Sequence, residues 1–139
     1  MLILDTNVLS ELMRPRPDAH VLDWARAQSG KEVYTTAINE AEMLHGVELL
    51  PEGKRRDALR AEIHSTSQQD LAGQVLGFDS QAARIYAHIA ASHRRVGKPI
   101  SYVDAQIAAI VKRENATLAT RNTSDFESFG IRLIDPWTS

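Results

Sequence analysis

The sequence of 139 residues contains no cysteine. This absence excludes disulfide bonds, thiolate zinc sites, iron–sulfur clusters and a cysteine nucleophile. No apolar run approaches the roughly 20 residues that are needed to cross a bilayer. The first residues, Met1 to Asp5, also lack the basic flank of a signal peptide. We therefore expect a cytoplasmic protein that has no contact with a membrane.

An excess of positive charge is also missing, because 16 Lys and Arg stand against 18 Asp and Glu, which gives a net charge of -2. If nucleic acid is a partner, a local patch must attract it. Hydrophobic residues make up 43% of the chain and charged residues 24%, which is typical of a globular protein. Length and composition together predict one folded domain over residues 1–139.

Short apolar segments alternate with amphipathic ones along the chain. Runs of three to four apolar and β-branched residues predict buried strands of a parallel sheet, at 2–4, 33–35, 75–78, 117–120 and 131–134. Helical periodicity and capping residues predict helices between them, at 8–13 after an Asn7 cap, after Asp18, at 37–50 after Thr36, at 54–70, at 81–96 and from Ser101. This alternation predicts an α/β fold with three layers, α/β/α, around a mainly parallel sheet of roughly five strands.

Four carboxylates fall near the ends of these predicted elements. Asp5 follows the first strand, Glu42 lies in the helix after the second strand, and Asp104 and Asp125 lie just before and just after the fourth. Since ligands of parallel α/β sheets gather at the carboxyl ends of the strands, we expect these acids to share one edge. Close like charges repel unless protons or a cation neutralise them, and oxygen ligands favour Mg²⁺ or Mn²⁺ over zinc.

Each of these acids also has a purely structural interpretation. Asp5 suits a turn at the end of a strand, and Ser101 with Asp104 has the spacing of a helix cap. Glu42 and Asp125, taken singly, suit solvated positions. Glu42 and His45 form a Glu-x-x-His pair, but a di-iron site needs a second such pair, and the sequence has none. Only the joint placement of the four acids favours a metal site.

Basic residues gather in three places, at Arg14 and Arg16, at 54–60 and at 94–98. We interpret each group as a solvated helix face, with phosphate binding as the alternative. Glycine-rich phosphate loops and a G-x-S-x-G nucleophile elbow are both absent from the sequence.

Four motifs and the C-terminal segment are specific in combination. They are Leu4-Asp5-Thr6-Asn7-Val8, Ala41-Glu42 with Gly46, Asp104-Ala105 with Ile107-Ala108-Ala109, Thr120-Arg121-Asn122 with Asp125-Phe126, and Asp135-Pro136-Trp137. In this order they resemble the PIN-domain ribonuclease toxins of the VapC type, and most of all the FitB subgroup. The resemblance runs essentially from end to end.

The resemblance implies a PIN-like fold and the toxin of a type II toxin–antitoxin system, which hydrolyses RNA with Mg²⁺ or Mn²⁺. Its partners would be an antitoxin with a DNA-binding domain, operator DNA for the complex, and a second copy in a homodimer. Asp5, Glu42 and Asp104 fall on acidic positions of the family's site, with Thr6, Asn7 and Thr120 as supporting residues. The alternative is a PIN-like partner of a DNA-binding antitoxin that acts mainly in transcriptional regulation and has little nuclease activity.

The fourth acidic position departs from part of the family. Some relatives, including FitB-type proteins, carry an acid where this chain has Asn122, whereas others use the later position, here Asp125. We therefore expect Asp125 to act as the fourth metal ligand and Asn122 as a supporting residue.

Overall fold

A computed structural model describes residues 1–28 and 30–139. Five strands form one parallel sheet in the order β3-β2-β1-β4-β5. Their bounds are Leu2–Leu4 (β1), Val33–Thr36 (β2), Val75–Leu76 (β3), Thr117–Ala119 (β4) and Arg132–Ile134 (β5). The predicted strands and their parallel arrangement are confirmed, although the strand expected at 75–78 has only two residues.

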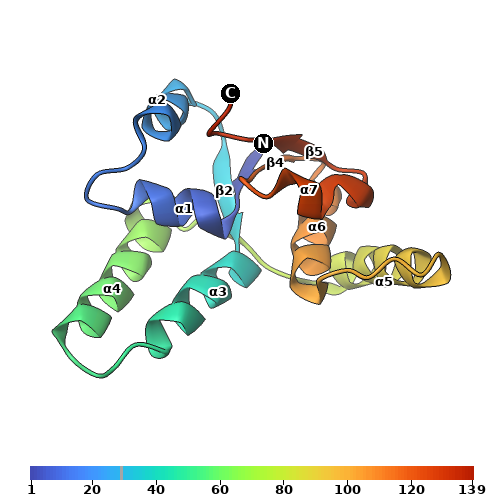
Figure 1. The fold of residues 1–139 in the computed structure, drawn as a ribbon, viewed down its shortest axis with the longest axis horizontal. Helices are drawn as coiled ribbons and strands as arrows, with labels where there is room; N and C mark the ends of the chain where they lie inside the picture. The colour runs from blue at the N-terminus through green and yellow to red at the C-terminus, as the bar shows by residue number, and fades with distance from the viewer. Residues whose placement is uncertain (29) are drawn as a thin grey trace.

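Helices cover both faces of this sheet (Figure 1). One layer contains α1 (Thr6–Leu12), α2 (Ala19–Ala27) and α4 (Lys54–Ser65), which continues into a π-helical turn at Thr66–Asp70. The other contains α5 (Ser80–Arg95), α6 (Tyr102–Glu114) and α7 (Thr123–Phe126), which continues into a 3-10 turn at Glu127–Phe129. Helix α3 (Ala37–Glu48) contributes apolar side chains to both layers. The predicted three-layer α/β/α architecture is confirmed.

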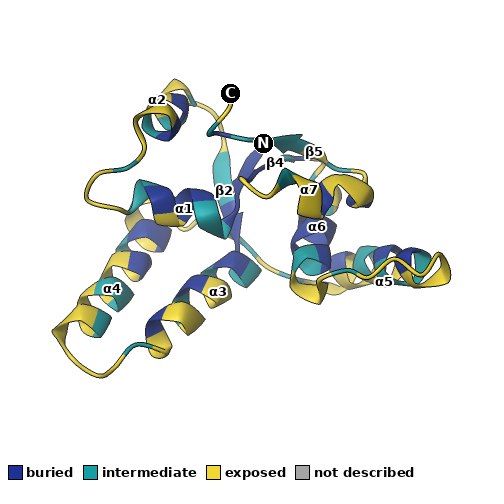
Figure 2. Cartoon of the chain, in the orientation of Figure 1, coloured by how far each residue is buried: buried dark blue, intermediate teal, exposed yellow. Residues whose placement is uncertain are grey.

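The alternation of side chains along β1 divides the interior into two cores. Leu2 and Leu4 point to the core under α1, α2 and α4, while Ile3 points to the core under α5 and α6. Figure 2 shows the corresponding buried stripes on the helix faces that meet the sheet and exposed residues on the outer faces of α4 and α5. In the described part of the chain, no helix is long and apolar enough to cross a membrane.

The start of α1 differs from the prediction. Asn7 was expected to cap a helix at 8–13, but Asp5 is the cap, since its side chain accepts a hydrogen bond from the Thr6 backbone N–H. Asn7 therefore lies inside the first turn, where its amide is free to make other contacts. The predicted caps Asp18, Thr36 and Ser101 are confirmed, and the helix predicted at 81–96 is capped by Asp79.

Candidate active site

Asp5 stands at the carboxyl end of the central strand. Its backbone N–H donates to the Ala119 carbonyl of β4 at 2.9 Å, so the residue is fixed to the neighbouring strand. Its carboxylate is buried and accepts four hydrogen bonds. One oxygen accepts from the Thr6 N–H at 2.9 Å and the Asn39 amide at 2.8 Å, and the other from the Thr120 hydroxyl at 2.7 Å and the Asn7 amide at 3.4 Å. The position and orientation of this negative charge are therefore fixed before any ligand arrives.

Asn39 in α3 connects Asp5 to the next strand, and sequence reasoning missed it. Its side-chain carbonyl accepts from the Thr36 hydroxyl at 2.7 Å, and its amide donates to Asp5 and also to the Thr6 hydroxyl at 3.0 Å. Asn39 is completely buried. The available signal was a polar residue three positions after the Thr36 cap, following the apolar residues Ala37 and Ile38.

Glu42 lies one helical turn beyond Asn39 and meets the same network. The Thr6 hydroxyl donates to its carboxylate at 2.9 Å, which supports the predicted place of Thr6 beside the acids. Partial loss of hydration raises the pKa of Glu42, the Thr6 hydrogen bond opposes this, and the nearby Asp5 charge raises it further. Glu42 is therefore electrostatically coupled to Asp5.

Thr120, directly after β4, connects several of these residues through its hydroxyl group. Besides donating to Asp5, its hydroxyl accepts from the Asn7 amide at 3.2 Å and from the Asn122 backbone N–H at 3.1 Å. The Asn7 carbonyl accepts in turn from the Arg121 backbone N–H at 3.1 Å. Asn122 takes part through its backbone, and its side chain makes no capping hydrogen bond at the start of α7.

Asp104 and Asp125 bring two more acids to this edge. Ser101 accepts from the Asp104 backbone N–H at 3.2 Å, so Asp104 stands in the capped first turn of α6, as predicted. Partial burial raises the pKa of Asp104 to about 6, with further contributions from the charges of Asp5, Asp125 and Glu42. The other three acids that the sequence selected, Asp5, Glu42 and Asp125, therefore all lie within electrostatic reach of Asp104.

The donor set contains only oxygen and suits a hard divalent cation. Among residues 1–28 and 30–139, no group of three or more acidic or histidine side chains is drawn together closely enough to hold a metal ion. Mg²⁺ keeps several of its waters in protein sites and often uses only one or two carboxylates directly. The acids fit such a partly hydrated ion and do not form a closed protein cage.

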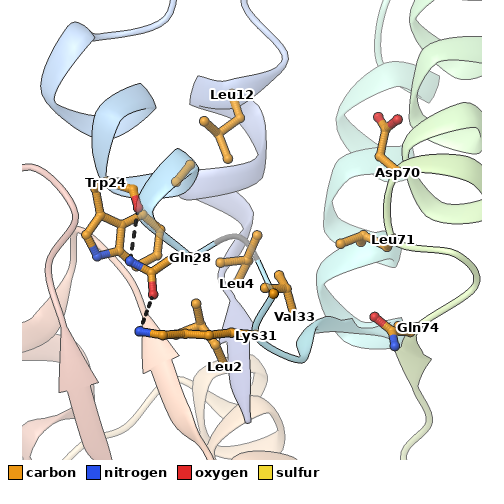
Figure 3. Close-up of a pocket in the computed structure, with 12 residues that line it drawn as sticks. Leu2, Leu4, Leu12, Trp24, Gln28, Lys31, Val33, Asp70, Leu71 and Gln74 are labelled. Carbon is orange, nitrogen blue, oxygen red and sulfur yellow. Dashed lines mark hydrogen bonds between the residues drawn. The ribbon is translucent and has the colours of Figure 1, made fainter.

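A hollow of about 340 Å³ lies elsewhere, between α2 and the π-helical turn (Figure 3). Its walls include Leu2, Leu4 and Val33, and Lys31 donates to Gln28 at its rim. Asp70 is the one carboxylate among its described lining residues. Since it lacks converging acids, this hollow does not compete with the Asp5 edge as a metal site.

Replacing Asn39 with alanine is expected to lower the free energy of unfolding by about 1–3 kcal/mol, because Asp5 and Thr36 would each lose a buried hydrogen-bond partner. Urea denaturation would measure the change. Gln28→Ala, which removes an amide from a half-exposed surface pair, is the control and should change stability much less. Equal stability of Asn39→Ala and the parent protein would contradict a role for this amide in holding Asp5.

Comparison with known families identifies the class of protein to which this fold and its acidic site belong. The family described as "PIN domain" matches residues 2–131, and the chain therefore belongs to the PIN-domain family. The resemblance recognised in the sequence is confirmed.

Individual relatives are similar over nearly the whole chain. The plasmid stability protein StbB of Pseudomonas syringae pv. tomato and the VapC ribonuclease Y4jK of Sinorhizobium fredii are each 42% identical over 137 residues, which is 99% of this chain and 99% and 98% of theirs. Toxin FitB of Neisseria gonorrhoeae is 38% identical over 137 residues, 99% of both chains. Among solved structures, FitAB bound to an IR36 DNA fragment has a TM-score of 0.87 at 39% identity, covering 99% of this chain and 96% of that chain. FitAcB from Neisseria gonorrhoeae has a TM-score of 0.85 at 38% identity, with complete coverage of both chains.

Proposed function

We propose that this chain is the toxin of a type II toxin–antitoxin system and that it hydrolyses RNA phosphodiester bonds with Mg²⁺ or Mn²⁺. The observation that carries the proposal is the edge where the charges of Asp5, Asp125 and Glu42 raise the pKa of Asp104, and the charge of Asp5 raises that of Glu42. A protein gains nothing in stability from four such charges. A function that uses a cation explains why they are together.

Asp5 and Asp104 would hold the ion most directly, with Glu42 and Asp125 as further ligands or partners through water. When bound, a divalent cation in such a site lowers the pKa of a water and balances the charge of the scissile phosphate. Neighbouring polar residues of this chain position the acidic side chains. Asn39 and Thr120 orient Asp5, and Thr6 orients Glu42, so that the acids need little rearrangement on binding.

The proposed partners follow from the relatives. The solved structures with chains similar to this one include FitAB bound to a DNA fragment and FitAcB. They also include VapBC-1, in which the matching chain is 26% identical to this one. We infer for this chain an antitoxin with a DNA-binding domain, operator DNA that the complex binds, and assembly as a homodimer.

Incubation of the purified protein with RNA tests the proposal. We expect cleavage in Mg²⁺ or Mn²⁺ and none in EDTA. The products should have 5′-phosphate and 3′-hydroxyl ends, since water attacks the phosphorus and the 3′-oxygen leaves. Failure to cleave any RNA in either metal would favour the alternative of a regulatory partner with little nuclease activity.

Asp125→Ala is expected to lower activity and weaken Mn²⁺ binding more than Asn122→Ala does, because only Asp125 adds negative charge for a hard cation. Isothermal titration with Mn²⁺ and cleavage rates would compare the two variants. Asn122 contacts Thr120 through its backbone, and the side-chain change leaves that contact in place. A larger loss in Asn122→Ala would show that the fourth ligand has been misassigned.

A further inference from the structure

Arg121 lies next to the four acids in the fold, and its guanidinium has no carboxylate partner among the residues that the structure describes. Arg121 follows β4 directly after Thr120, and its backbone N–H donates to Asn7, which itself contacts Asp5. Its side chain is exposed. Across residues 1–28 and 30–139, no carboxylate oxygen lies within the 4.0 Å of an ion pair to its guanidinium.

The guanidinium is nevertheless held in place by an aromatic ring. Its central carbon lies 4.8 Å from the centroid of the Trp137 ring, which is a cation–π contact. Trp137 is itself fixed, because its backbone N–H donates to the Asp135 carboxylate at 2.8 Å and its ring packs against the core on the α1 side. A guanidinium carries five N–H donors. Across residues 1–28 and 30–139, no hydrogen bond joins the Arg121 side chain to another protein group, so these donors remain for another acceptor.

The charge balance of this edge indicates what that acceptor is. Four carboxylates gather there, and a polyanionic substrate must approach them, so a fixed positive charge beside them lowers the repulsion. Arginine presents a planar fork that matches a phosphate, and an arginine that is already oriented loses less side-chain entropy on binding.

Resting on the proposed ribonuclease function, we propose that Arg121, held on Trp137, binds a backbone phosphate of the RNA next to the scissile bond and positions the strand over Asp5. The acceptor is a phosphate of single-stranded RNA. A carboxylate of a protein partner is the competing acceptor, and the experiment below separates the two.

The test uses a short single-stranded RNA of mixed sequence, with binding measured by anisotropy in EDTA and cleavage measured in Mg²⁺. Arg121→Ala should weaken binding and raise KM about 10-fold or more, with a smaller change in kcat. It should also reduce the slope of log affinity against log salt by about 0.7, the value for one phosphate contact on a single strand. Arg121→Lys should restore the slope and only part of the affinity, and Trp137→Leu should keep the slope while weakening binding less than Arg121→Ala.

Arg132→Ala is the matched control. Arg132 is also exposed, but it lies at the start of β5 and therefore at the opposite edge of the sheet from Asp5. Thermal unfolding of each variant checks that the fold is intact. If Arg121→Ala and Arg132→Ala bind and cleave RNA alike, the phosphate contact is refuted, and a protein carboxylate becomes the remaining acceptor. If the parent protein does not cleave RNA but loses binding and salt slope in Arg121→Ala, the phosphate contact holds and the nuclease proposal fails.

Discussion

Asp5→Asn is expected to abolish metal-dependent RNA cleavage, lowering kcat/KM by at least about 100-fold. We expect this magnitude because mutating even a residue that only supports a metal ligand typically lowers metal affinity or activity roughly 10- to 100-fold. Asparagine keeps the volume of aspartate and still accepts from Thr6 and Asn39, but it carries no charge for the ion. Cleavage rates in Mg²⁺ and binding of Mn²⁺ would both report the loss.

Asp18→Asn is the matched control for this change, because Asp18 is also an aspartate that caps a helix, far from the acids. Asparagine caps about as well as aspartate, so this variant should keep full activity. Asp5→Asn should stay folded, since relief of charge repulsion with Asp104 offsets the mismatched contact with Asn7. Full metal-dependent activity of a folded Asp5→Asn protein would remove Asp5 from the metal site.

Asp104→Asn is expected to abolish cleavage and at the same time to stabilise the metal-free protein above pH 6. The folded state raises the pKa of Asp104 from its ordinary value of 3.8 to about 6. The contribution of this group to stability is therefore fully present below pH 3.8 and is lost as the pH rises through about 6. Because Asp104 is only half-buried and solvent screens its charge, we expect a gain of about 1 kcal/mol at pH 7.5 for the variant.

Urea denaturation in EDTA between pH 4 and pH 8 would measure this effect. The parent protein should lose stability relative to Asp104→Asn across that range, and Mg²⁺ should restore stability to the parent but not to the variant. Asp23→Asn, an exposed change in α2, should follow the parent at every pH. Identical pH profiles for the parent and Asp104→Asn would show that the acids do not repel one another as the geometry indicates.

The sequence predicted the fold well because its signals are local. The apolar run at 2–4 and the caps at Asp18, Thr36 and Ser101 are decided by neighbouring residues, and all appear in the structure. In the basic segment at 54–60, Lys54 and Arg55 are exposed, as interpreted, whereas the Arg56 side chain is largely covered. Arg56 and Arg60 form ion pairs with neighbouring acids. Strand β3 lies at the edge of the sheet and pairs with β2 at two positions, Val75 and Leu76.

The site could be predicted only in part, because its supporting contacts join distant segments. Asn39 is 34 residues from Asp5 in the chain, and Thr120 is 115 residues away. The Asn7 cap was wrong for the same reason, since the position of Asp5 beside β4 starts the helix earlier than the local pattern indicates. The four acids were selected because Asp5 directly follows the first strand and the other three lie in the segments that flank the predicted strands. The contact of Arg121 with Trp137 joins two loops beyond the strands and leaves no periodic pattern.

The attachment of Asp5 to β4 has a consequence for how a PIN-domain protein of this kind evolves. Its backbone is hydrogen-bonded to β4 at the centre of the sheet, and its carboxylate is held by residues from α1, from α3 and from the position directly after β4. A substitution that shifts this carboxylate therefore disturbs the folding core, and selection removes it for instability before any new specificity appears. If the chain cleaves RNA as proposed, new RNA preferences must instead accumulate in the exposed residues around the acids, such as Arg121, where changes leave the core intact.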